Sequence, residues 1–305
     1  MIKGFGQYCA LIGSALAAIW FGLASPAIAF EGIRLTLLGA GSASQSGTRP
    51  GSVTLIEAGD EVLLMDCGPG TVQRLEQAGV GLSELTAVFL SSLDPALVEG
   101  CRELWSAERN AGRQPPAVWG PQGVRAFFDD IDRERRPDEP PTDAHDLVDN
   151  IIYQADGVTV TAFVTDNPAV PQSFGYRVDA FRRSATVSGH TRYSENLIRN
   201  ARGAHVLLHE VAAASTQSLS AEAVRRTLEG HTSPEDAAKV FRAVRPYLAV
   251  YAPVVLFGLS EDDLLRRTRR AYAGPLEIGR DSMIIEIQNE VQLRSAPSDG
   301  PRSSR

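Results

Sequence analysis

Long apolar runs, cysteines and excess positive charge are all scarce in this sequence of 305 residues. Beyond the first thirty residues, no segment is long and apolar enough to cross a bilayer as a helix. Acidic residues outnumber basic ones, 37 to 30, which gives a formal net charge of −7. Because bulk electrostatics would repel a polyanion, we expect no nucleic acid among the partners of this chain.

The first 29 residues have the pattern of a cleavable signal peptide. One positive charge, Lys3, precedes an apolar run from Ala10 to Ala24, and the small residues Ala27 and Ala29 follow. We expect cleavage after Ala29 and a periplasmic or secreted protein without a stable membrane anchor, because this run is short for a membrane span. An uncleaved N-terminal anchor is the alternative. Cleavage would leave 276 residues (305 − 29) and a net charge of −8 (29 basic and 37 acidic residues).

Two of the three cysteines, Cys67 and Cys101, lie beyond the predicted signal peptide. Export would permit a disulfide between them, but the sequence gives no distance between the two positions. Two buried thiols are the alternative, and the sequence leaves the choice open.

Predicted strands and helices alternate along the rest of the chain without a clear domain boundary. Short runs rich in β-branched residues or leucine, separated by glycine and other turn residues, predict strands. These strands are expected at 33–39, 52–58, 61–66, 85–90, 151–154, 158–164, 175–180, 185–187, 248–256 and 283–287, and a short strand with a turn is expected within 115–123. Helices are expected at 71–78, 97–109, 124–135, 194–202, 221–228, 234–245 and 262–273. The pattern predicts one α/β domain over 30–294, with two sheets and helices outside them, followed by a disordered polar tail over 295–305.

Seven short motifs occur in a characteristic order. They are 37–42 (LLGAGS), 63–68 (LLMDCG), 119–123 (WGPQG), 174–177 (FGYR), 187–191 (VSGHT), 208–210 (LHE) and 231–235 (HTSPE). With these motifs the chain resembles the metallo-β-lactamase superfamily, and most closely its ribonuclease Z and arylsulfatase branch. The resemblance implies a four-layer αββα sandwich and, in typical members, hydrolysis at a zinc centre.

The histidine-rich metal motif of that family is missing. Where the family has THLHSDH, residues 91–97 read SSLDPAL. The resemblance places the seven expected metal ligands on Ser92, Asp94, Ala96, Leu97, Asn167, His190 and Pro253. A hydrolytic zinc site needs at least three protein donors of the imidazole, thiolate or carboxylate type. Since only Asp94 and His190 keep such donors, we expect the family zinc to be lost and no metal cofactor to be present.

Two rearranged sites remain open as alternatives. Asp94 and His190, together with Asn167 or Asp166, contain donors for a single borderline metal ion. Ser92, Asp94 and His190 also include the residue types of a nucleophilic triad, although no nucleophile elbow accompanies them.

Glu210 and His231 match motifs that the resemblance places outside the metal shell, where they would handle protons near the leaving group. They are therefore the candidate catalytic residues. The structural alternative is that His231 forms a hydrogen bond at the start of the helix capped by Ser233, while Glu210 holds a loop. His145 and His205 match no role in the family.

Because the fold of the family is retained while its metal-binding residues are replaced, we expect an exported pseudoenzyme that performs no hydrolysis. It would bind a small molecule or a partner protein in the cleft where the family has its active site. One alternative is a metallo-hydrolase that acts through a rebuilt site, as a phosphodiesterase, a ribonuclease Z-like or an arylsulfatase-like enzyme. Another alternative is a structural subunit of a homo- or hetero-dimer.

Overall fold

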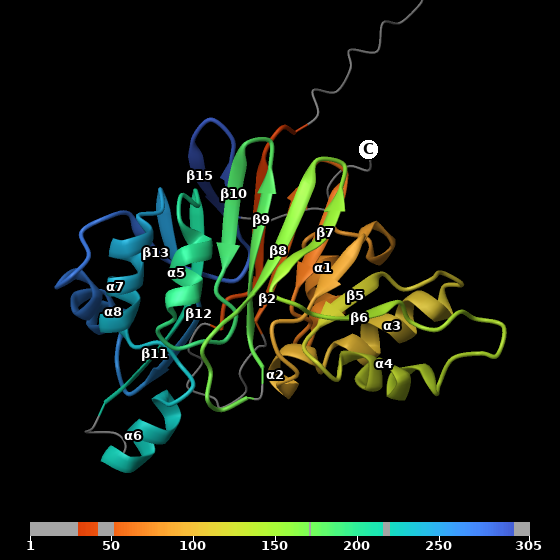
Figure 1. Cartoon of the computed structure of the whole chain (residues 1–305), viewed down its shortest axis with the longest axis horizontal. Helices are drawn as coiled ribbons and strands as arrows, with labels where there is room; N and C mark the ends of the chain where they lie inside the picture. The colour runs from red at the N-terminus through yellow and green to blue at the C-terminus, as the bar shows by residue number, and fades with distance from the viewer. Residues whose placement is uncertain (1–29, 42–51, 171, 216–219, 296–305) are drawn as a thin grey trace, which may run out of the picture.

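The computed structural model of the chain describes residues 30–41, 52–170, 172–215 and 220–295 (Figure 1). The predicted signal peptide and residues 296–305 of the predicted tail lie outside these ranges, while Ser295 is the last residue of a strand and not part of a tail. In the described part of the chain, no helix combines the length and the apolar character that a membrane span requires.

In the described ranges, the first sheet has eight strands in the order β15-β14-β1-β2-β3-β4-β5-β6. Their bounds are β1 (Ile33–Gly39), β2 (Val53–Ala58), β3 (Glu61–Met65), β4 (Ala87–Phe89), β5 (Ala117–Gly120), β6 (Ala144–Asp146), β14 (Met283–Ile287) and β15 (Val291–Ser295). Strands β3 to β6 run parallel, and the remaining neighbours pair antiparallel.

The second sheet has seven strands among the described residues, in the order β13-β12-β11-β10-β9-β8-β7. Their bounds are β7 (Asn150–Ala155), β8 (Val158–Val164), β9 (Phe174–Ala180), β10 (Arg183–Val187), β11 (Val206–Ala214), β12 (Leu248–Phe257) and β13 (Leu276–Ile278). Strands β10 to β13 form a parallel set, and its loops at the carboxyl ends contribute to the site described below.

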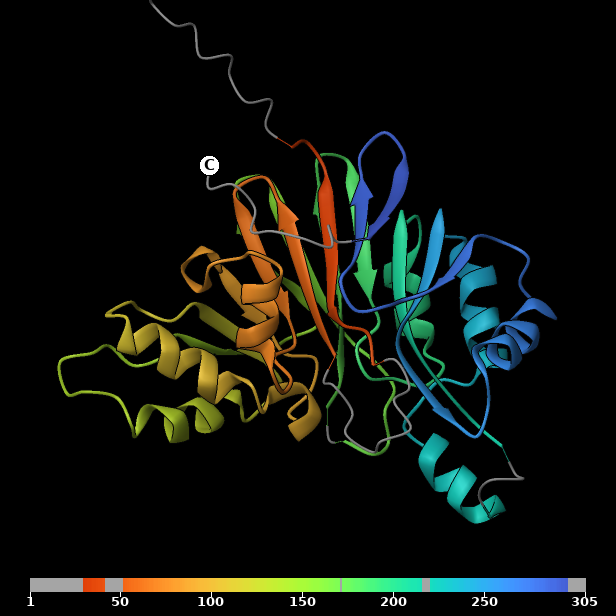
Figure 2. The same ribbon diagram turned by 180° about the vertical axis from the view of Figure 1, so that it is seen from behind.

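Helices cover the outer face of each sheet, as both views show (Figures 1 and 2). On the first sheet lie α1 (Thr71–Gln77), α2 (Pro95–Val98), α3 (Cys101–Asn110), α4 (Val124–Asp132) and the short 3-10 helix η1 (Leu82–Glu84). On the second sheet lie α5 (Glu195–Ala201), α7 (Pro234–Val244) and α8 (Glu261–Arg269), while α6 (Ala221–Leu228) extends away at one end. The four-layer αββα sandwich is thereby confirmed.

Alternation along the strands separates the layers of the core. In β1, Leu35 and Leu37 face the other sheet, whereas in β2 Leu55 faces the helices of its own side. In β11, Leu208 points into the space between the sheets and Leu207 points toward α7. Since successive side chains of a strand point to opposite faces, continuous apolar runs are what two-sided burial requires.

The helix predicted over 97–109 is in fact two helices, α2 and α3, separated at Gly100. Asp94 caps α2 and Pro95 occupies its first turn. The backbone N–H of Gly100 donates to the carbonyl oxygen of Cys67 at 2.9 Å, and a Cβ on Gly100 would lie 2.2 Å from the carbonyl oxygen of Gly68. This close approach of two backbones explains the break, which composition alone did not indicate.

Cys67 and Cys101 are two buried free thiols in this structure, the second of the two alternatives that the sequence left open. Burial raises the pKa of the Cys101 thiol well above its ordinary value, and a hydrogen bond with Cys67 acts in the same direction.

Candidate functional site

A cavity of about 100 Å³ lies where loops of the two sheets meet. Its walls come from strands β10, β11 and β12 and from loops of both sheets. The lining residues are Gly41, Ser52, Asp66, Asp94, Ala96, Leu97, Val187, Gly189, His190, Glu210, His231, Ala252, Pro253 and Val255. Val187 is the last residue of β10, whereas Glu210 and Pro253 lie in the middle of β11 and β12.

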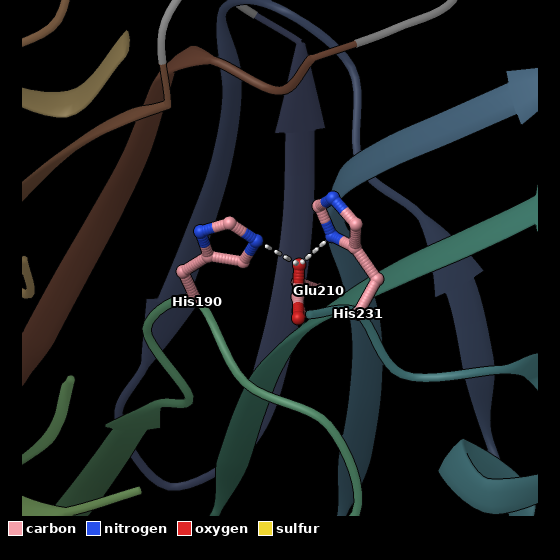
Figure 3. A group of neighbouring side chains, drawn as sticks. All are labelled: His190, Glu210 and His231. Carbon is pink, nitrogen blue, oxygen red and sulfur yellow. Dashed lines mark hydrogen bonds and ion pairs between the residues drawn. The ribbon is translucent and has the colours of Figure 1, made fainter. Parts of the chain in front are cut away.

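Three polar side chains converge on one point of this cavity: His190, Glu210 and His231 (Figure 3). His231 Nδ1 lies 2.7 Å from Glu210 Oε2, and His190 Nε2 lies 3.9 Å from the same oxygen. One possible ligand atom from each residue lies within 4.8 Å of the other two. Two imidazoles and one carboxylate in this arrangement are donors suited to a single divalent ion.

The carboxylate of Glu210 is the fixed centre of this group. Glu210 lies on β11, and its side chain is only 2% exposed. Its Oε1 accepts a hydrogen bond from the backbone N–H of Thr191 at 2.7 Å, and its own N–H donates to Ser188 Oγ at 3.1 Å. Within the described residues, the ion pairs of Glu210 are with His190 and His231, and no arginine or lysine neutralises it.

His190 is positioned by the turn that follows β10. Gly189 has φ +64°, and a Cβ there would lie 2.0 Å from the carbonyl oxygen of Phe174, so the turn requires glycine. The carbonyl oxygen of His190 accepts hydrogen bonds from Asn167 Nδ2 at 3.1 Å and from Ser173 Oγ at 2.5 Å. These contacts hold the backbone of His190 while its imidazole reaches the cavity.

His231 is positioned by the start of α7. The hydroxyl of Thr232 donates to the carbonyl oxygen of Thr191 at 2.7 Å, and Ser233 caps the helix by accepting from the N–H of Asp236. The predicted capping role of Ser233 is confirmed. The imidazole of His231 is not used at the cap but faces Glu210.

Asp66 lines the same cavity and was not singled out by sequence analysis. Its carboxyl accepts hydrogen bonds from the N–H of Ser91 at 2.7 Å and from Ser91 Oγ at 2.9 Å. Complete burial raises the pKa of Asp66 to about 7, with a smaller contribution from the nearby charge of Asp94, while the bonds from Ser91 oppose this shift. A carboxyl that titrates near neutral pH can hold or release a proton under ordinary conditions.

The structure brings five of the seven former ligand positions to the cavity wall: Asp94, Ala96, Leu97, His190 and Pro253. The carboxylate of Asp94 accepts from the N–H of Ala96 at 2.9 Å and so caps α2. Alanine, leucine and proline side chains offer no donor atom, so these residues do not fit the family's zinc centre.

The other two positions, Ser92 and Asn167, are buried and bonded to the backbone. Ser92 Oγ accepts from the N–H of Asp94 at 3.2 Å, and Asn167 Oδ1 accepts from the N–H of Ala169 at 2.9 Å. Asp166 is half exposed and pairs with Arg192. The alternative metal set of Asp94, His190 and Asn167 or Asp166 is therefore not the set that converges here, because Glu210 and His231 surround His190 instead.

Comparison with known proteins agrees with this architecture. Residues 62–252 match the family described as a β-lactamase superfamily domain. This chain belongs to the metallo-β-lactamase superfamily. Ribonuclease Z of Mycobacterium marinum (strain ATCC BAA-535 / M) is 30% identical over 276 residues, which cover 84% of this chain and 99% of that protein. The chain is therefore a ribonuclease Z-like member of the superfamily.

Two solved structures of the superfamily share the fold. The metallo-β-lactamase fold protein YhfI from Bacillus subtilis has a TM-score of 0.70 and 17% identity, and the match covers 84% of this chain and 100% of that one. The short form of human tRNase Z (ELAC1) has a TM-score of 0.64 and 20% identity, over 84% of this chain and 99% of that one.

Proposed function

We propose that this ribonuclease Z-like chain is a hydrolase of phosphodiester bonds that works through a rebuilt site, in which His190, Glu210 and His231 hold one divalent metal ion. The convergence of these three side chains in the cavity is the observation that supports the proposal. The alternative of a metallo-hydrolase with a rebuilt site, raised from the sequence, thus has better support than the metal-free pseudoenzyme.

The donor set and its surroundings favour an ion. The carboxylate of Glu210 is buried and its ion-pair partners among the described residues are two histidines, so an ion ligated by Glu210 would offset the cost of burying its charge. The bond from the Thr191 N–H to the other carboxylate oxygen fixes the orientation of Glu210, as outer hydrogen bonds do in metal sites. An ion held here would supply Lewis acidity to a phosphoryl oxygen.

The protein's own side chains would orient the reacting group and supply a proton. His190, Glu210 and His231 orient the reacting group within the cavity. Asp66 lies on the wall of the same cavity, and its pKa of about 7 lets it hold a proton for a leaving oxygen at neutral pH.

The relatives are named ribonuclease Z and tRNase Z, which supports a phosphodiester as the bond attacked. Asp94 and Glu210 place negative charge on the cavity wall, Asp66 adds to it only once it has lost its proton, and the whole chain carries a net charge of −7. Because such a site repels a long polyanion, we propose a small diester and not transfer RNA as the substrate. Export after cleavage of the predicted signal peptide also remains a proposal, whereas a partner protein in the cleft and a dimer belong to the pseudoenzyme and structural-subunit alternatives.

Turnover and metal content together test this function. The chain is freed of metal with a chelator, reloaded with zinc or manganese, and assayed with bis(p-nitrophenyl) phosphate. We expect about one ion per chain and hydrolysis that falls by about 100-fold or more in His190→Ala, Glu210→Gln and His231→Ala. His145→Ala is the matched control, because this histidine stacks on Trp119 away from the cavity.

A metal-free binding protein predicts a different result. Bound metal far below one ion per chain, together with hydrolysis no faster than buffer, would reject the proposed function and support the pseudoenzyme. Equal activity in the control and in all three site variants would show that hydrolysis occurs elsewhere.

A further inference from the structure

A second hollow shares the lining residue Asp94 with the cavity. Its volume is about 460 Å³, and its other lining residues are Leu93, Pro95, Pro121, Gln122, Val170 and Gln172. We call these six residues the diester groove. Because Asp94 lines both hollows, a substrate whose phosphoryl group lies in the cavity can place another group in the second hollow.

We infer that the diester groove binds an uncharged apolar group of the substrate, such as an aromatic ring or a short alkyl chain. The inference rests on the proposed function for the bond that is cleaved, and it adds the class of group attached to that bond. A nucleotide chain would instead need cations along its path.

The chemistry of the walls carries this inference. Leucine, valine and two prolines supply the apolar surface, and the two glutamines supply neutral amides. Among the residues that the structure describes, no lysine or arginine lines the groove, so a string of phosphates would find no counter-charge from them. The single charge, Asp94, is negative and is used at the start of α2.

The groove is also formed before any ligand arrives. Pro95 lies in the first turn of α2, Pro121 is buried, and both have a fixed φ. The N–H of Gln122 donates to Gln172 Oε1 at 2.9 Å and so joins two walls. Leu93 is half-buried against the apolar cluster beneath the helices of the first sheet. Pre-formed apolar walls with a few amides are typical of small-molecule sites of about 300–1,000 Å³.

The kinetic experiment compares phenyl p-nitrophenyl phosphate with methyl p-nitrophenyl phosphate, two diesters with the same leaving group and the same charge. Thymidine 5′-p-nitrophenyl phosphate is the third substrate and represents a nucleotide. For the metal-loaded chain we expect kcat/KM for the phenyl diester to exceed that for the methyl diester by about 10-fold or more, and the nucleoside diester to be poorer than the phenyl one. In Leu93→Ala the preference for phenyl over methyl should shrink by about 5-fold or more. Val148→Ala, at an exposed valine that lines neither hollow, is the control and should keep the wild-type preference.

A binding measurement separates this inference from the proposed function. Phenylphosphonate and methylphosphonate are titrated into the metal-loaded chain by calorimetry, which needs no turnover. Tighter binding of phenylphosphonate that Leu93→Ala weakens would support the groove even if no diester were hydrolysed. Equal binding of the two phosphonates, binding of neither, or a preference for the nucleoside diester would overturn it.

Discussion

Replacing Asp66 with asparagine should stabilise the protein at pH 8 and leave its stability nearly unchanged near pH 4. Burial raises the pKa of this carboxyl in the folded chain from 3.8 to about 7. Below about pH 4 the group is protonated in both states, so it has no effect on the free energy of unfolding. Between about pH 4 and 7 only the unfolded chain loses the proton, so the free energy of unfolding falls as the pH rises. Above about pH 7 both states lose the proton, and this loss of stability stays constant.

The size of the effect follows from the shift. Each pKa unit corresponds to 1.36 kcal/mol, so a shift of about 3 units makes the penalty of order 4 kcal/mol above pH 7. Asparagine suits the position, since Asp66 has φ +61° and asparagine adopts such values more readily than most residues. Its amide can also keep a hydrogen bond with Ser91, whose N–H now donates to Asp66.

Urea unfolding of the wild type and Asp66→Asn at several values between about pH 4 and 8 measures this difference. The variant should gain stability over the wild type progressively through this range, by a few kcal/mol at the upper end. Asp60→Asn, at an exposed turn, is the matched control for loss of one negative charge. A difference between wild type and Asp66→Asn that is the same at pH 5 and pH 8 would refute the reasoning.

Two further substitutions test how the site and its scaffold are held. Gly189→Ala would press a Cβ against the carbonyl oxygen of Phe174, so it should lower the free energy of unfolding by about 3 kcal/mol or more and displace His190. Gly203→Ala, with φ +70° but open space around it, should lower the free energy of unfolding by only about 1 kcal/mol. Thermal melts compare the stability of the two variants, and metal content compares their sites. Asp132→Ala removes the 2.6 Å partner of the buried Arg109 guanidinium, which keeps Glu139 at 3.8 Å, and also the acceptor of two hydrogen bonds from Thr142. The free energy of unfolding in urea should fall by about 3 kcal/mol, and a loss below about 1 kcal/mol would contradict this.

Much of the fold could be predicted because periodic apolar runs mark its strands. The strands at Ile33–Gly39 and Val158–Val164 were predicted with the bounds that the structure has. Strand β11 was missed as an element, since its polar pair His209 and Glu210 and its run of alanines do not alternate. The three-residue strands β6 and β13 depend on pairing with a neighbour, which no local pattern records.

The candidate site was predicted less well, because the resemblance assigned its three residues to two different parts of the family's active site. His190 was identified as one of two altered ligand positions that keep a metal donor and was grouped with Asp94, while Glu210 and His231 were placed outside the metal shell. Their meeting depends on the parallel pairing of β10 with β11 and on the start of α7, which bring residues 190, 210 and 231 together. For Asp66 the sequence held one usable signal, a carboxylate directly after a buried strand and before Cys67.

Titration of the metal-free chain with Co²⁺, followed by visible absorption and calorimetry, tests most directly whether His190, Glu210 and His231 hold one ion. We expect saturation at about one ion per chain, with the spectrum of nitrogen and oxygen ligands. Binding should be lost or much weakened in His190→Ala, Glu210→Gln and His231→Ala and kept in His145→Ala. Absence of saturable binding, or binding that all three site variants retain, would contradict the account.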